Sequence, residues 1–80
     1  MAEIIEIEVI TRAQIFTEGA EKGWYNILSG SEVTYLTTKQ KAITAYKNFK
    51  REFGKDFEMR IVKIPAESHY IEQFQIWYKR

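Results

Sequence analysis

Basic side chains recur along residues 38–55 at positions that a helix would turn outward, and phosphate groups are the ligands they could bind. At about 100° per residue, Lys47 and Arg51 lie on the outer face of such a helix. A phosphate backbone is attracted to this surface because each neutralised phosphate releases counterions. One arginine and few amides would make bidentate contacts to bases scarce, so nucleic-acid binding should be weak and independent of sequence. The candidate contacts, called the basic face below, are Lys39, Lys47, Lys50, Arg51 and Lys55.

The basic face has a second interpretation, because solvated helices also carry lysines for solubility. The charge is unevenly distributed along the chain. Residues 1–36 hold two basic and six acidic side chains, and residues 37–80 hold ten basic and five acidic ones, for a net charge of +1. Such asymmetry can steer an anionic partner to one face, or allow two copies of the chain to meet head to tail.

The two tryptophans, Trp24 and Trp77, could stack on bases or nucleotides, as aromatic residues do in single-strand binders. A tryptophan in a small sheet is more often part of the core or of a subunit interface. Tight binding to one nucleotide would require a formed pocket, with Trp24, Trp77 or His69 as the residues to test.

Residue types that perform catalysis or hold metals are sparse. The single histidine, His69, has no cysteine and no second histidine with which to form a metal site, and we expect it to lie in a turn. Ser29, Ser31 and Ser68 fall in predicted turns without a nucleophile-elbow motif. The four glycines are scattered singly, so no phosphate-binding loop is predicted. We expect no catalytic residue, no metal, no cofactor and no enzymatic activity.

One amphipathic helix is predicted over residues 38–53. Thr37 and Gln40 resemble a capping box at its start, and Gly54 follows its last aromatic residue, where a left-handed glycine often ends a helix. Apolar residues four, three and four positions apart form its stripe, namely Ala42, Tyr46, Phe49 and Phe53.

Strands are predicted on both sides of this helix. Residues 4–16 alternate apolar and polar side chains without glycine or proline, which favours one long strand. Residues 24–28 and 32–36 form a predicted hairpin around Ser29-Gly30-Ser31. Residues 57–64 and 70–78 complete the order β-β-β-α-β-β, with Pro65 ending the fourth strand.

The register of the hairpin is open. A type II′ turn at Gly30-Ser31 gathers Trp24, Leu28 and Val33, among others, on one face. A three-residue loop instead gathers Tyr25, Ile27 and Val33 and sends Trp24 to the other face.

The economical arrangement is an α+β fold, with one twisted, mostly antiparallel sheet of four to five strands and one helix packed on one face. The helix stripe at Tyr46, Phe49 and Phe53 should pack against the regular strand faces. The expected partners are Ile5, Ile7, Val9, Met59, Ile61 and Phe74.

The opposite face of this sheet should carry exposed apolar side chains, which usually mark an interface. We therefore expect a homodimer or other small homo-oligomer. The candidate interface residues are Ile10, Trp24, Leu28, Ile64, Ile71 and Trp77.

Eighty residues make one domain, 1–80, with a small core and no cysteine to add a disulfide. The chain shows no basic leader followed by an apolar run, and no window approaches the ~20 apolar residues of a membrane span. We expect a soluble, cytoplasmic protein without a membrane partner.

In length and α+β layout, though in no motif, the chain resembles the small single-domain inhibitors and accessory proteins that bacteriophages encode, anti-CRISPR proteins among them. The resemblance implies a non-enzymatic protein that works by occluding a partner. The first hypothesis is therefore a small interaction protein that self-associates and binds or occludes a protein partner. The alternative is a weak, sequence-independent nucleic-acid or nucleotide binder that uses the basic face of helix 38–53.

Overall fold

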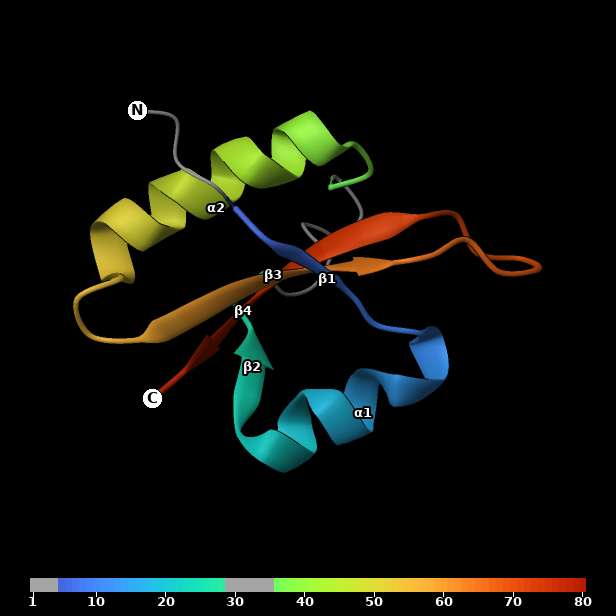
Figure 1. The fold of residues 1–80 in the computed structure, drawn as a ribbon, viewed down its shortest axis with the longest axis horizontal. Coiled ribbons are helices and arrows are strands. Elements are labelled where there is room, and N and C mark those ends of the chain that lie inside the picture. The colour runs from blue at the N-terminus through green and yellow to red at the C-terminus, as the bar shows by residue number, and fades with distance from the viewer. Residues whose placement is uncertain (1–4, 29–35) are drawn as a thin grey trace.

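The computed structural model describes residues 5–28 and 36–80, which form a mixed four-stranded sheet between two helical layers (Figure 1). The strands are β1 (Ile7–Val9), β2 (Trp24–Asn26), β3 (Glu58–Ile64) and β4 (Gln73–Lys79). One layer is the helix α2 (Lys39–Phe53). The other, called the helical segment below, spans residues 12–22 and consists of η1 (Arg12–Gln14), α1 (Ile15–Glu18) and η2 (Ala20–Lys22).

The α+β class agrees with the sequence-based expectation, and the sheet is mixed, with two antiparallel strand pairs and one parallel pair. The expectation of a single helix on one face is wrong, because the helical segment covers the other face. The strand order of the sheet is β1-β3-β4-β2, and β1 runs parallel to β3 with Ile7 opposite Ile61. The other neighbours are antiparallel. The long connection between β1 and β3 contains both helical layers, which is the kind of crossover that a parallel pair needs.

The prediction of one strand over residues 4–16 is wrong beyond Val9. A capping box opens the helical segment: the Thr11 backbone N–H donates to Gln14 Oε1 at 3.3 Å, and the Thr11 hydroxyl donates to the same oxygen at 2.9 Å. The Gln14 N–H donates to the Thr11 carbonyl at 2.9 Å, which closes the first turn. These local bonds satisfy backbone groups that a strand would have paired with a neighbour. The alternation of residues 11–16 therefore coincides with short helical turns.

The helix α2 matches its prediction within one residue, but both of its caps differ. Thr38, not Thr37, is the N-cap, and its hydroxyl accepts from the Lys41 N–H at 3.3 Å. Gly54 has a right-handed backbone (φ −65°) and donates its N–H to the Lys50 carbonyl at 2.8 Å, so it extends the last turn rather than adopting the left-handed cap. No helix among the described residues is long and apolar enough to cross a membrane.

The core between α2 and the sheet follows the predicted stripe in part. Ala42 and Tyr46 are buried, and the half-buried Phe49 packs on the same cluster. The buried members of this cluster are Leu28, Leu36, Ala42, Tyr46, Ile61, Phe74 and Ile76. Two predicted members are missing: Val9 lies on an edge strand and is 62% exposed, and Phe53 lines a pocket beyond the cluster.

A second core lies between the sheet and the helical segment. Ile10, Val62 and Trp77 form its buried centre, with Ile15 and Trp24 packed against it. Gly19 approaches the Trp77 ring so closely that an added Cβ would lie 3.2 Å from the ring edge. The central strands β3 and β4 are thus buried on both faces, as expected from their apolar residues on both sides.

The first half of the predicted hairpin is the strand β2, which pairs with β4 and places Asn26 opposite Trp77. Its second half, except the buried Leu36, and the turn between the halves lie outside the described residues, so the hairpin register stays a prediction. The last strand starts at Gln73, three residues later than predicted.

Candidate functional site

All five residues of the basic face are exposed, and so is Lys41. The described residues form three ion pairs, Lys22–Glu18, Arg60–Glu8 and Lys63–Glu72, and none of them involves a cation of α2. The Arg51 guanidinium instead lies 3.4 Å from the Asn48 amide oxygen. No cation of the helix therefore forms an ion pair with a carboxylate among the described residues.

The candidate interface residues do not form an open surface. Ile10, Leu28, Ile64 and Trp77 are buried within the chain, Trp24 is half-buried, and Ile71 is exposed. The helical segment covers the sheet face that we expected to be bare, and Leu28 packs in the core on the other side. Most of the apolar surface on which the expectation of self-association rested is therefore buried within the chain.

The helical segment and the sheet enclose an open pocket of about 450 Å³, called the tryptophan pocket below. Trp77 is 2% exposed and contributes to its inner wall, whereas Phe16 is 65% exposed and so lies at the rim. The lining residues that carry chemistry are Arg12, Phe16, Trp24, Asn26, Gln75 and Trp77. Two of the three residues that we singled out for a nucleotide pocket, Trp24 and Trp77, are thus brought together.

Two amides of the tryptophan pocket have a fixed orientation. Gln75 Oε1 accepts from Trp77 Nε1 at 2.8 Å, and Asn26 Oδ1 accepts from the Leu28 N–H at 2.9 Å. An indole N–H and a backbone N–H can only donate, so the oxygen of each amide must face its donor. The NH₂ groups of Asn26 and Gln75 point elsewhere and find no acceptor among the described residues.

Two arginines stack on aromatic rings around this layer. The Arg12 guanidinium lies 3.9 Å from the Tyr70 ring centroid, and its Nε is buried without a hydrogen-bond partner among the described residues. Arg60 lies 5.2 Å from the Trp24 ring centroid and 5.1 Å from that of Trp77. It also donates to Glu8 Oε2 at 2.6 Å, which ties β3 to the edge strand β1.

The helical segment carries an ion pair at its surface, between Glu18 and Lys22. Lys22 lowers the pKa of Glu18 below its ordinary 4.5, through a 2.8 Å hydrogen bond and through its charge. This pair spans one turn at the surface and contributes to holding the segment helical.

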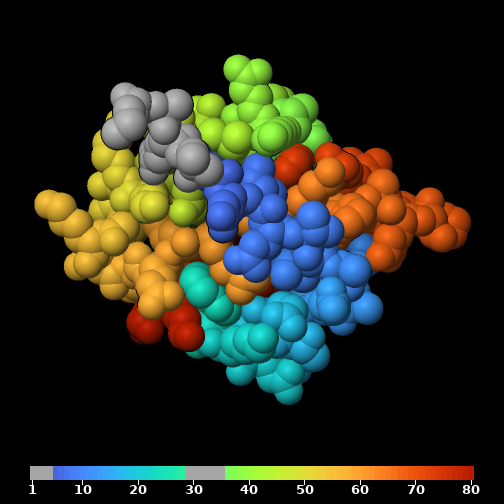
Figure 2. Space-filling view, viewed as in Figure 1, coloured from blue at the N-terminus to red at the C-terminus, as the bar shows by residue number. Residues whose placement is uncertain are grey.

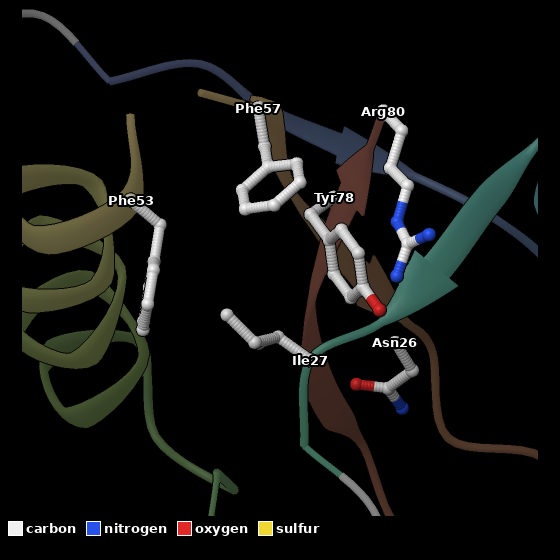
Figure 3. Close-up of a pocket in the computed structure, with 6 residues that line it drawn as sticks. All are labelled: Asn26, Ile27, Phe53, Phe57, Tyr78 and Arg80. Atoms are coloured by element: carbon white, nitrogen blue, oxygen red, sulfur yellow. The ribbon is translucent and has the colours of Figure 1, made fainter. Parts of the chain in front are cut away.

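A second pocket, of about 370 Å³, opens beside the C-terminal end of α2 (Figure 3). Phe53 reaches it from α2, and Phe57 and Tyr78 meet edge to face with centroids 5.4 Å apart. Asn26, Ile27 and Arg80 complete its lining. Phe53 therefore lies at the end of the main core, where its ring stacks on Phe49 with centroids 6.4 Å apart.

The remaining candidate, His69, is exposed in the connection between β3 and β4 and does not line the tryptophan pocket. Within residues 5–28 and 36–80, no three histidine or acidic side chains gather where they could hold a metal ion.

Comparison of the chain with protein-family models, with curated proteins and with solved structures found no match in any of the three. The function is therefore argued from the surfaces and pockets themselves.

The sequence argument missed Arg12, Asn26 and Gln75. Gln75 had a signal, because it is a polar residue inside a strand that is apolar on both faces, and such a residue must find a partner. Asn26 and Arg12 carried no such signal in the sequence. The sheet register and the helical segment bring them to the pocket from distant parts of the chain.

Proposed function

We propose that the protein acts by binding rather than by catalysis, and that the basic face of α2 binds the phosphate backbone of nucleic acid. The observation that carries this proposal is the set of exposed cations on α2 that have no ion-pair partner among the described residues. The opposite face of the helix packs on the sheet through its buried residues. The cations therefore lie on the solvent side of an element whose position is fixed.

Attraction to phosphate should dominate this binding. The basic face holds four lysines, which act as point charges, and one arginine, which can bind two acceptors at once. Contacts of this kind position a protein on the backbone but do not distinguish bases. The expected ligand is a mixed-sequence duplex or single strand, bound without sequence preference.

The dependence of affinity on salt tests the proposal. If each of the five cations neutralises one phosphate, log K falls with log salt with a slope of roughly −4.5 on duplex DNA. The variant Lys47→Gln/Arg51→Gln should reduce the slope to roughly −2.7 and weaken binding at every salt concentration. Fluorescence anisotropy of a labelled duplex measures both quantities.

A matched control removes two cations from elsewhere. Lys22→Gln/Lys63→Gln has the same net charge as the α2 variant, but both of its lysines are ion-paired and lie off α2. It should keep the parental slope. Equal losses in the two variants would mean that net charge, and not the basic face, governs binding, and would contradict the proposal.

The second candidate is binding of a protein partner, a further copy of the chain included, which is the mode of action of the phage inhibitors that the chain resembles. It is favoured by β1, an edge strand whose only neighbour within the described residues is β3. Figure 2 shows β1 at the surface, between α2 and the helical segment. Val9 on this edge is 62% exposed, and unpaired edges are templates for strand addition.

Light scattering of Val9→Lys and the parent protein tests the self-association form of this candidate. A charged residue on an edge strand blocks strand addition. A dimeric parent and a monomeric variant would support it, and a monomeric parent at high micromolar concentration would contradict it.

A further inference from the structure

The tryptophan pocket has the size and the polarity of a small-ligand site, and it lies across the sheet from the basic face. Its volume of about 450 Å³ falls within the range of roughly 300–1,000 Å³ that ligand pockets occupy. Aromatic side chains and a few polar groups line it together, as in most binding sites for flat organic molecules.

The lining of the pocket contains a buried polar atom without a partner. Arg12 lines the pocket, and its Nε is buried and has no hydrogen-bond partner among the described residues. Gln75 is 8% exposed, and its oxygen accepts from the Trp77 indole, so its NH₂ group is directed away from that bond. A ligand oxygen in the pocket can accept from this NH₂ group.

The other polar groups of the pocket also donate. Asn26 presents its NH₂ group, because its oxygen is committed to the Leu28 N–H. The flat face of the Arg12 guanidinium lies on Tyr70, which leaves the edge of the guanidinium available for hydrogen bonds. No carboxylate lines the pocket, so a ligand rich in acceptors and negatively charged fits it.

We propose that the tryptophan pocket binds a nucleotide whose base carries ring carbonyls, such as uracil. The base lies among Phe16, Trp24 and Trp77, and its carbonyl oxygens accept from Asn26 and Gln75. The phosphate accepts from Arg12, since a guanidinium binds phosphate with two parallel hydrogen bonds. Adenine fits less well because it has an amino donor where uracil has a carbonyl.

The chain supplies its own reporter for this pocket. Its two tryptophans both line the tryptophan pocket, so intrinsic fluorescence measures occupancy without a label. Titration with uridine monophosphate should change the emission in a saturable way, and adenosine monophosphate should bind about tenfold more weakly, the loss of about one hydrogen bond. Inorganic phosphate should produce no saturable change at the same concentrations.

One variant removes a donor while keeping its structural bond. In Asn26→Asp the carboxylate still accepts from the Leu28 N–H, but the NH₂ group is gone and a negative charge faces a carbonyl oxygen of the base. Affinity for uridine monophosphate should fall at least about tenfold. The control Asn48→Asp makes the same chemical change on the exposed side of α2 and should bind as the parent does.

Two further arms locate the source of the ligand and separate this site from the basic face. These measurements use Lys47→Gln/Arg51→Gln, in which the basic face is weakened. In this variant, a short single-stranded oligouridine that binds no more tightly than the monophosphate would assign the pocket to a free nucleotide, and one that binds much more tightly would assign it to an unpaired base of a strand. Lys47→Gln/Arg51→Gln should leave monophosphate binding unchanged. Absence of saturable binding by every nucleotide, or equal binding of all of them and of phosphate, would overturn the proposal.

Discussion

Trp77 Nε1 and Gln75 Oε1 form a 2.8 Å hydrogen bond between two buried side chains on the same face of β4. This bond satisfies the one donor of the indole and fixes which end of the amide faces the pocket. Gln75 thus has a structural role through its oxygen and a proposed binding role through its nitrogen.

Gln75→Leu should lower the free energy of unfolding by about 1–3 kcal/mol, because it leaves the buried indole N–H without an acceptor. Gln73→Leu, on the same face of the same strand but half-buried, should change it by less than about 0.5 kcal/mol. Urea denaturation measures both values. Equal stability of the two variants would mean that the indole bond contributes nothing.

The core beneath α2 should be most sensitive at the strand side chains. Ile76 is completely buried, so Ile76→Ala should cost about 2–5 kcal/mol. Phe49 is half-buried, so Phe49→Ala should cost only roughly 1–2 kcal/mol. Thermal or urea unfolding measures both losses of stability. A larger loss for Phe49→Ala than for Ile76→Ala would contradict the described packing of this core.

The sequence was most informative where a pattern is long. The apolar stripe of α2 extends over about three helical turns, and the strands β3 and β4, which are apolar on both faces, have seven residues each. Patterns of this length distinguish a helix from a strand. The prediction of a strand over residues 11–16 failed because six residues are too few for an alternating apolar and polar pattern to exclude short helical turns. The Thr11-x-x-Gln14 capping box was the signal that favoured those turns.

The candidate site could be predicted only in part, for a different reason. The basic face depends on one helix and follows from its own sequence. The tryptophan pocket depends on strand register, since Asn26 meets Trp77 only because β2 pairs with β4. No local pattern encodes that pairing.

Arg60 should matter more for stability than the carboxylate with which it pairs. The Glu8 side chain is 55% exposed, so Glu8→Gln should cost less than about 1 kcal/mol. Arg60→Ala should cost about 1–3 kcal/mol, because it also removes stacking on Trp24 and Trp77. A double-mutant cycle measured by urea unfolding separates the two contributions.

The pKa of Glu18 gives a pH-dependent prediction. Because the pKa is lowered in the folded state, the Glu18–Lys22 interaction contributes stability above pH 4.5, and this contribution is lost as the pH falls through the lowered value. Lys22→Gln should return the pKa of Glu18 toward 4.5, as measured by NMR titration of the carboxyl. An unchanged pKa in that variant would show that Lys22 is not the cause.

The most direct test of the central claim, that the basic face of α2 binds nucleic acid, is backbone NMR of the labelled protein titrated with a mixed-sequence duplex at low salt. We predict that the amide shifts that change with added duplex are concentrated at residues 39–55, and that they return to their free positions as salt is raised. Shifts confined to residues 12–26 and 73–79, with those of α2 unmoved, would contradict the claim.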